Sequence, residues 1–362
     1  MKQEVYRPSF LRISRFLSEV LHPVWRLFSH HPYNVPIDKK SIQSILVTEY
    51  HCIGDVILII PALKALKEEF PKAKIILVTN NAAEELAKKI TDADEIISYS
   101  APWVKGWTSV TNWKGTLAVI IKLRNRKLDL GIDFKGDIRN LFLLRGISPK
   151  HRFGFTATGG KYLLTHPQNF PFNKHQVDRA LFLLKSVRVS PQTSQFNEDK
   201  KRVQYVDDRI VLHPGANHPE RQWPIKNWKE LYEHLSKIHK VYIVCAPDTV
   251  DVIKKMSETI PNMNIFKGSL LEFSQWLSGA QLLIGSDSMA VHLAVAMGTP
   301  SLAIFGSQNP ELTRPKGDMG SIIKPKNTCP HKRKHWRLCS KCMSSITPDD
   351  VYKKIESLLR CN

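Results

Sequence analysis

Asp55 is the first residue along the chain whose type and position suit proton-transfer chemistry. It ends the loop EYHCIGD (residues 49–55), which separates an apolar run that predicts a strand from one that predicts a helix. Domains built from alternating strands and helices place reactive groups at such turns, and a carboxylate there can act as a general base. Aspartate is also favoured as a helix cap. Both interpretations of Asp55 are open at this point.

A second polar loop, PGANHPERQWP (residues 214–224), follows the apolar run RIVLH. Glycine lets backbone amides approach phosphate oxygens, so Gly215, Ala216 and Asn217 are candidate phosphate-binding residues. Arg221 would add a fixed cationic fork for a diphosphate. An ordinary surface arginine is the alternative interpretation of Arg221.

A third motif, GSDSMAVH (residues 285–292), predicts the start of a helix that Gly298 ends. Ser286 or Asp287 is expected to cap this helix. The free amides and the positive end of its dipole would bind a pyrophosphate. Because Asp287 would repel phosphate, we expect it to accept hydrogen bonds from sugar hydroxyls. His292 is either a ligand contact or a buried structural histidine.

The C-terminal part of the chain contains four cysteines, Cys329, Cys339, Cys342 and Cys361. The two-residue gap between Cys339 and Cys342 lets two thiolates reach one metal ion. The first cysteine would supply a third ligand, and His331, His335 or Cys361 a fourth. The alternatives are therefore a structural zinc or iron site and a set of free thiols.

Short apolar segments alternate with helical segments from residue 44 onward. The expected strands are 45–48, 74–79, 95–99, 129–134, 151–155, 209–213, 241–246, 264–266, 281–285 and 301–305. The expected helices are one that ends at 70 and others at 82–90, 116–126, 138–145, 177–187, 228–238, 250–260, 270–277, 289–297 and 349–359. Two rounds of this alternation predict an α/β fold with two Rossmann-like, doubly wound domains, which bind ligands at the carboxyl ends of their strands.

The pattern divides the chain into four parts. We expect an N-terminal segment with a linker (1–40), a first domain (41–175), an inter-domain connection (176–207) and a second domain (208–362) with the cysteine-rich segment 329–342.

The N-terminal segment predicts an amphipathic basic helix, because apolar residues recur at helical spacing and arginines occupy other positions. These residues are Phe10, Ile13, Leu17, Val20, Leu21, Val24 and Phe28, with Arg12, Arg15 and Arg26. Such a helix either lies on anionic lipid as an interfacial anchor or packs on its own domain.

The composition is that of a globular protein, with 362 residues, 42% hydrophobic and 24% charged. The formal net charge of +20 favours an anionic partner, and no nucleic-acid-binding motif accompanies it, so we expect no nucleic acid partner. The longest apolar run, residues 56–63, is shorter than the roughly twenty residues of a membrane-spanning helix. No signal-peptide pattern is found, and the sparse cysteines favour the cytoplasm.

Four motifs together resemble glycosyltransferase family 9, the heptosyltransferase family, over about 45–359. The family's N-terminal signature has its counterpart in HCIGDV (51–56), and the stretch 133–139 also matches. Arg221 stands at the family's lysine position ahead of a tryptophan–proline pair. The family's most telling motif is DSMAVHLA (287–294) in this chain.

Three motifs depart from the family pattern. Met289 replaces the usual glycine, Arg221 the usual lysine, and His51 and Cys52 the usual serines. We expect these departures to alter the donor pocket.

The resemblance implies two Rossmann-like domains that face each other across a cleft, the GT-B arrangement. The N-terminal domain would bind the acceptor and the C-terminal domain the nucleotide-sugar donor. Inverting transfer would need no metal cofactor, with Asp55 as the general base. Arg221 and the amides of Ser288, Met289 and Ala290 would stabilise the departing nucleoside diphosphate.

The resemblance also implies the substrates. The sugar would be heptose from ADP-heptose, and the acceptor the inner core of lipopolysaccharide or a related anionic glycolipid, bound by Lys135 and Arg139. The protein would work in the cytoplasm, in peripheral contact with the anionic inner membrane surface.

Other functions remain open. The same residues suit a non-catalytic sugar-nucleotide or glycan-binding protein, although two retained aspartates favour an enzyme. A family 9 transferase with a different sugar or a protein acceptor is a further alternative. A nucleic-acid-binding Rossmann protein is disfavoured, because aromatic and basic residues are not interleaved.

Overall fold

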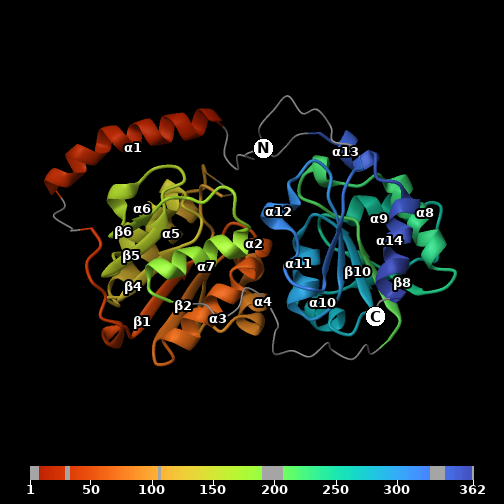
Figure 1. The fold of residues 1–362 in the computed structure, drawn as a ribbon, viewed down its shortest axis with the longest axis horizontal. Helices are drawn as coiled ribbons and strands as arrows, with labels where there is room; N and C mark the ends of the chain where they lie inside the picture. The colour runs from red at the N-terminus through yellow and green to blue at the C-terminus, as the bar shows by residue number, and fades with distance from the viewer. Residues whose placement is uncertain (1–7, 29–32, 105–106, 190–206, 327–338, 361–362) are drawn as a thin grey trace. The chain divides into compact units, whose positions relative to one another are not determined.

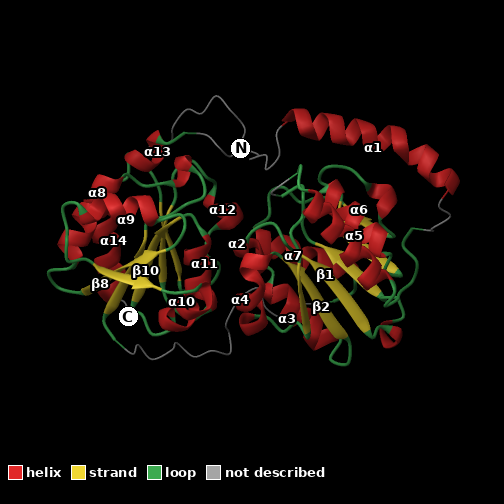
Figure 2. Cartoon of the chain, turned by 180° about the vertical axis from the view of Figure 1, so that it is seen from behind, coloured by secondary structure: helices red, strands yellow, loops and turns green. Residues whose placement is uncertain are grey.

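The computed structural model describes residues 8–28, 33–104, 107–189, 207–326 and 339–360 (Figure 1). These residues form two compact units, 8–189 and 207–360. Each unit contains a parallel six-stranded sheet, with helices beside the strands (Figure 2). The predicted α/β class with two doubly wound domains is therefore confirmed.

In the first unit the strand order is β3-β2-β1-β4-β5-β6. The strands are β1 (Ser44–Thr48), β2 (Lys74–Thr79), β3 (Glu95–Ser98), β4 (Leu130–Asp133), β5 (His151–Phe155) and β6 (His166–Gln168). The order reverses between β1 and β4, where Thr48 pairs with Asp133 in register. Doubly wound sheets bind ligands beyond the carboxyl ends of the strands at such a switch point.

The helices of the first unit are α1 (Pro8–Phe28), α2 (Ile53–Leu58), α3 (Ile60–Glu69), α4 (Glu84–Ile90), α5 (Val110–Arg124), α6 (Ile138–Ile147) and α7 (Gln176–Ser186). The single helix expected up to residue 70 is divided at Ile59, because Pro61 opens a new helix. α5 begins earlier than expected, since the Ser109 hydroxyl caps it by accepting from the Asn112 amide. α7, expected in the connection, packs against α3 and β5.

α1 packs on the first unit through a narrow side. Leu11, Ser14 and Ser18 are buried there. The Gly160 amide donates to the Ser18 hydroxyl at 2.7 Å, and the guanidinium of Arg15 donates to the Ala157 carbonyl at 2.9 Å. Close packing on its own domain, one of the two alternatives for this helix, is thus observed. No helix in the described ranges is long and apolar enough to cross a membrane.

In the second unit the strand order is β12-β11-β10-β7-β8-β9. The strands are β7 (Arg209–His213), β8 (Lys240–Cys245), β9 (Asn264–Lys267), β10 (Leu282–Ser286), β11 (Ser301–Ile304) and β12 (Gly320–Ile323). The helices are α8 (Ile225–Leu235), α9 (Val250–Ser257), α10 (Leu270–Leu277), α11 (Met289–Ala296), α12 (Pro310–Thr313), α13 (Lys341–Ser344) and α14 (Pro348–Arg360).

Two tryptophans organise the core beside α8. Trp223 and Trp228 are buried and meet edge to face, with ring centroids 5.0 Å apart. The Ile346 carbonyl, between α13 and α14, accepts hydrogen bonds from the Trp223 indole at 2.9 Å and the Asn227 amide at 3.2 Å. The C-terminal segment is therefore joined to the loop that precedes α8.

Candidate active site

Asp133 organises the polar end of the first sheet. Its side chain is fully buried at the last position of β4, where Oδ2 accepts from the Thr48 hydroxyl at 3.1 Å and the Asn140 amide at 3.0 Å. Oδ1 accepts from the Gly136 backbone amide at 2.7 Å. Burial, with a smaller contribution from the nearby Glu49, raises the pKa of Asp133 to about 6. Asp133 thus holds the loop that presents the next residues.

Gly136 is required in this loop. Its φ is +72°, a conformation that side chains disfavour, and a Cβ there would lie 2.8 Å from the Phe155 Cβ atom. The chain therefore turns tightly after β4 and directs Lys135 toward α2.

Asp55 receives two side-chain hydrogen bonds in the first turn of α2. Its Oδ2 lies 2.6 Å from the Lys135 ammonium, and its Oδ1 accepts from the Gln176 amide of α7 at 2.6 Å. The N-cap of α2 is Cys52, which makes no side-chain cap bond. The capping interpretation of Asp55 is therefore wrong, and its carboxylate is held by residues distant in sequence.

The charge state of Asp55 follows from these partners. Burial by itself would raise the pKa of Asp55, but the charge and hydrogen bond of Lys135, with the Gln176 hydrogen bond, outweigh it and lower the pKa to about 2. Asp55 is thus ionised at neutral pH. Lys135, predicted to bind the acceptor, here contacts the predicted base.

Arg139 is held at the start of α6. Its Nε and Nη2 atoms contact the two carboxylate oxygens of Asp137 at 2.8 and 2.5 Å, and Nη1 donates to the Trp103 carbonyl at 3.3 Å. Asp137 also caps α6 by accepting from the Arg139 amide. Burial opposes ionisation of Asp137, but Arg139 outweighs it and lowers the pKa of Asp137. The predicted acceptor residues Lys135 and Arg139 therefore flank one turn, each beside an aspartate.

Sequence reasoning missed two further polar residues here. Glu49 is buried, and its Oε1 lies 3.6 Å from Nδ1 of His51. The Tyr50 ring stacks on the His51 ring with centroids 5.3 Å apart. A polar residue at the carboxyl end of an apolar strand was the available signal for both Glu49 and Asp133.

In the second unit, Arg221 and Asp287 contact each other. Arg221 Nη1 lies 3.4 Å from Oδ2 of Asp287 and donates to its carbonyl at 3.4 Å, while Nη2 donates to Gln308 at 3.4 Å. Asp287 is almost fully buried, and burial raises its pKa although Arg221 acts in the opposite direction. The structure thus brings together two predicted donor residues that are distant in sequence.

The motif around α11 differs in detail from the prediction. Ser288, not Ser286 or Asp287, is the N-cap, and its side chain makes no capping bond. His292 is buried within the helix. Gly298 follows the helix with φ of +83°, as predicted for its end. Ala290, two residues before His292, is also buried, whereas Met289 is partly exposed.

The candidate phosphate loop after β7 lies next to β10, because His213 pairs with Gly285 in register. Gly215 is required there, since a Cβ would lie 2.5 Å from Asp248 Cγ and 2.7 Å from Thr249 Cγ2. Because Gly215 has no side chain, its loop can pack closely against the loop after β8. Ala216 is buried and Asn217 exposed, so Asn217 is the more accessible of the three predicted residues.

The sequence profile described as glycosyltransferase family 9 (heptosyltransferase) matches residues 116–342. The chain belongs to this family. It is therefore a glycosyltransferase, and the resemblance inferred from its motifs is confirmed.

Individual relatives are distant. The chain is 20% identical over 309 residues to a lipopolysaccharide core heptosyltransferase, OpsX, of Haemophilus influenzae, covering 80% of this chain and 86% of the relative. It matches a solved structure of E. coli heptosyltransferase WaaC with ADP-2-deoxy-2-fluoro heptose at a TM-score of 0.70 and 19% identity, covering 87% of this chain and 99% of that one. A structure of the iron-containing dodecameric glycosyltransferase TibC from enterotoxigenic E. coli matches at a TM-score of 0.53 and 14% identity, covering 88% and 77%.

Only part of the metal site predicted from the C-terminal cysteines lies within the described residues of this family 9 glycosyltransferase. Cys339 and Cys342 lie at the start of α13 with Sγ atoms 3.5 Å apart. Cys329, Cys361, His331 and His335 lie outside the described residues. Within the described ranges, no group of three or more possible metal-ligating side chains comes together.

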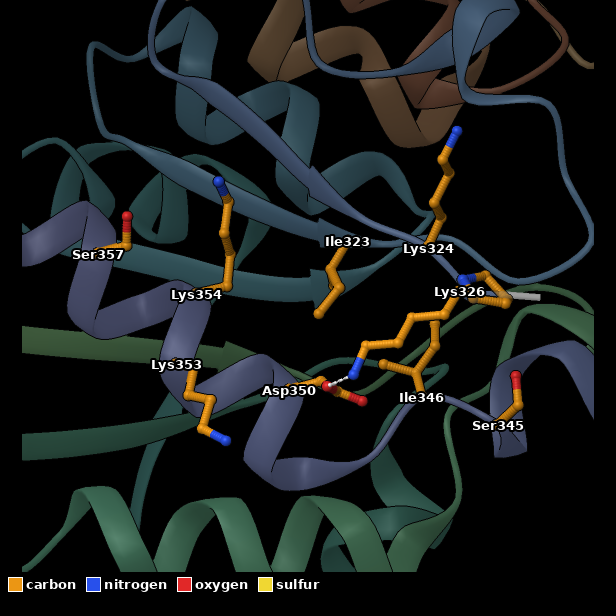
Figure 3. Close-up of a pocket in the computed structure, with 10 residues that line it drawn as sticks. Ile323, Lys324, Lys326, Ser345, Ile346, Asp350, Lys353, Lys354 and Ser357 are labelled. Atoms are coloured by element: carbon orange, nitrogen blue, oxygen red, sulfur yellow. Dashed lines mark hydrogen bonds and ion pairs between the residues drawn. The ribbon is translucent and has the colours of Figure 1, made fainter.

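A separate pocket of the transferase, about 320 Å³ in volume, lies between the end of β12 and α14 (Figure 3). Its lining includes Lys324, Lys326 and Lys354, and the Lys326 ammonium contacts Asp350 at 2.5 Å. The candidate donor residues do not line this pocket.

Proposed function

We propose that this glycosyltransferase moves heptose from ADP-heptose to the inner core of lipopolysaccharide or a related anionic glycolipid, with inversion and without a catalytic metal. The observation that carries the proposal is the ionised, partly buried Asp55 at the switch point of the first sheet, held by Lys135 and Gln176. The similarity to OpsX and to WaaC with an ADP-heptose analogue supports this choice of sugar and acceptor.

Asp55 is proposed as the general base. Its carboxylate takes the proton from the acceptor hydroxyl as that oxygen attacks the anomeric carbon. The bond from this carbon to the diphosphate breaks in the same displacement, so the configuration inverts and the nucleoside diphosphate leaves. A positioned base contributes about a hundred- to ten-thousand-fold to the rate.

Lys135 and Arg139 are proposed to bind the anionic groups of the acceptor. Lys135 is paired with Asp55 at 2.6 Å before the acceptor binds. A carboxylate or phosphate on the acceptor would compete for the ammonium, and this competition would raise the basicity of Asp55. The base would then become stronger when the substrate is in place.

Arg221 and the first amides of α11, from Ser288 to Ala290, are proposed to stabilise the departing diphosphate. Asp287 is proposed to bind a sugar hydroxyl. Asp287 lies 3.4 Å from Arg221, and this pairing supports the two separate roles. The cation of the pair can contact the phosphate while its anion contacts the sugar. Gly215, Ala216 and Asn217, in the loop after β7, are proposed to complete the donor site.

The acceptor determines the proposed location. A lipid-anchored inner core is reached from the cytoplasmic side of the inner membrane, so the enzyme would work there in peripheral contact with anionic lipid. The net charge of +20 supports this contact.

A structural zinc or iron held by the C-terminal cysteines is a further proposal. The 3.5 Å separation of the Cys339 and Cys342 sulfurs supports it, and the TibC structure is described as iron-containing. The residues present fit two thiolate ligands of such an ion, which would stabilise the segment and take no part in transfer.

The test compares Asp55→Asn with a matched control. Asp94→Asn also removes a carboxylate charge paired with a lysine, because Asp94 lies 2.7 Å from Lys67 in the same unit. With ADP-heptose and a water-soluble deacylated inner-core acceptor, Asp55→Asn should lower kcat at least about a hundredfold and leave ADP affinity unchanged. Asp94→Asn should keep normal turnover.

Two outcomes would overturn parts of the proposal. Near-normal turnover of Asp55→Asn would remove Asp55 as the base. The proposed substrates would be wrong if the unaltered enzyme transfers no heptose from ADP-heptose to the inner core but does use another nucleotide sugar or another acceptor.

A further inference from the structure

α1 leaves several large apolar side chains exposed within residues 9–23, where its side chains are described. The side that packs on the first unit is made by Leu11, Ser14 and Ser18. Five large apolar residues on its other sides are between 45% and 65% exposed, and they are Ile13, Phe16, Leu17, Val20 and Leu21. An amphipathic helix usually buries such residues against its own domain. Here the small side is buried and the large apolar side is available to a partner.

α5 carries a second exposed apolar stripe that the sequence analysis did not single out. Val110, Trp113, Leu117 and Ile121 recur at helical spacing and are between 43% and 67% exposed. Trp107, just before this helix, is also exposed. Clusters of exposed large apolar residues mark sites of protein or membrane interaction.

These two helices belong to one side of the first unit. α5 packs on α6, and both α6 and α1 pack on residues 161–163. The Arg139 guanidinium of α6 lies 5.4 Å from the ring centroid of Phe10 in α1. Phe142 of α6 is exposed as well. Both views show α1, α5 and α6 on the same side of the unit (Figures 1 and 2), and we call it the α1–α5–α6 face.

The charge of this face identifies its partner. The three helices contain eight arginines and lysines, three on α1, three on α5 and two on α6, against one acidic residue, Glu19. Basic residues around exposed tryptophans and aliphatic residues are typical of surfaces that bind anionic phospholipid. A second copy of the chain would bring two like-charged faces together, which disfavours self-association.

The face continues toward the candidate active site through aromatic rings. Trp107 and Trp113 lie with centroids 5.7 Å apart, Trp113 and Trp103 6.0 Å, and Trp103 and Tyr50 6.3 Å. Trp103 also accepts a hydrogen bond from Arg139 through its carbonyl. The exposed tryptophans are therefore connected by direct packing to the residues proposed to bind the acceptor.

We propose that α1, α5 and α6 together form a docking surface for an anionic phospholipid bilayer, with Trp107 and Trp113 in the headgroup region. This surface rests on the proposed membrane contact and extends it beyond the N-terminal helix. Docking through this face holds a lipid-anchored acceptor near Lys135 and Arg139. Tryptophan suits the headgroup region because its ring is apolar and its N–H is polar.

The test measures cosedimentation of the full chain with vesicles of phosphatidylcholine alone or with phosphatidylglycerol. Leu117→Glu/Ile121→Glu alters α5, and Leu17→Glu/Val20→Glu alters α1. Ile238→Glu is the matched control, because Ile238 is 63% exposed in the second unit. Each double variant should bind anionic vesicles at least about tenfold more weakly, since it replaces two apolar contacts with charges that anionic lipid repels. The control should bind normally.

A second measurement tests the tryptophans directly. Brominated lipids should quench the fluorescence of the unaltered enzyme, and Trp107→Phe/Trp113→Phe should lose most of this quenching. Circular dichroism and ADP affinity report whether each variant is folded. A folded α5 variant that binds anionic vesicles normally would overturn the role of α5. If the unaltered enzyme forms a dimer that the α5 variant cannot form, and vesicle binding is unchanged, the face is a self-association surface and the proposal fails.

Failure of docking and failure of the proposed function are distinguishable. With the water-soluble acceptor, the α1 and α5 variants should retain kcat, whereas transfer to vesicle-embedded acceptor should fall with vesicle binding. No transfer to either acceptor by the unaltered enzyme would refute the proposed substrates, whatever the vesicle result.

Discussion

Replacing Lys135 with methionine should raise the pKa of Asp55 sharply. Methionine keeps much of the side-chain length and removes the ammonium, which lies 2.6 Å from the carboxylate. Both side chains are mostly buried, 14% exposed for Asp55 and 21% for Lys135, so solvent screens the pair only weakly. The variant therefore isolates the contribution of one charge to the proposed base.

The magnitude follows from burial, which raises the pKa of Asp55, and from Lys135, which contributes most to lowering it. Its pKa is about 2, against 3.8 for an ordinary aspartate, although burial acts to raise it. Without Lys135 the pKa of Asp55 should therefore exceed 3.8, a change of at least about 1.8 units or about 2.4 kcal/mol at 1.36 kcal/mol per unit. Because the folded-state pKa is lowered, this stabilisation is present above pH 3.8 and is lost as pH falls toward 2. Lys135→Met should be less stable at neutral pH by an amount of this order.

The assay is carbon NMR titration of aspartate carboxyl groups labelled with ¹³C, with Asp55→Asn used for assignment. In Lys135→Met the Asp55 signal should titrate above pH 4, whereas in the unaltered enzyme it should remain ionised to the acid limit of the folded state. Lys67→Met is the control, because it removes the partner of Asp94 at 2.7 Å and should leave the Asp55 titration unchanged. An Asp55 signal that still shows no titration above pH 4 in Lys135→Met would refute this account of the base.

Three further predictions concern other parts of the chain. Arg221→Ala should weaken ADP binding, measured by calorimetry, because a cation facing phosphate is lost. Asp287→Ala should weaken the binding of ADP-heptose more than the binding of ADP. Equal losses of affinity for the two ligands would exclude a contact between Asp287 and the sugar. Because the pKa of Asp133 is raised from 3.8 to about 6, the free energy of unfolding should fall by about 3 kcal/mol as pH rises through that window, and urea denaturation of Asp133→Asn should lack this decline. Elemental analysis of chelator-free protein should find about one metal ion per chain, and less than about a tenth would leave Cys339 and Cys342 as free thiols.

The sequence predicted the sheets better than their edges. Central strands read as apolar runs because both of their faces are covered, and all eight of them were expected near their observed positions, as were the edge strands β3 and β9. The edge strands β6 (His166–Gln168) and β12 (Gly320–Ile323) were missed. β6 has only three residues and contains a proline, and β12 is partly exposed, so neither shows a clear apolar run.

The motifs predicted which residues belong to the site, but they did not predict which of these residues contact each other. Asp55 and Lys135 are 80 residues apart in sequence, and only the adjacency of β1 and β4 brings them within 2.6 Å. The cap of α11 was assigned to the wrong residue because several neighbouring side chains could serve as caps. Periodicity identified α1 as amphipathic, but it could not show that Ser14 and Ser18 form the packed side.

The hydrogen bonds at the Ile346 carbonyl bear on how modular this enzyme is. Ile346 follows α13, which packs against residues 219–221, and its carbonyl holds Trp223 and Asn227. Residues 341–346 are therefore no separable appendage, because they support the loop that presents Arg221. A chimera that exchanges only the C-terminal segment between two family members would also change the donor loop. Successful grafts should therefore carry both together.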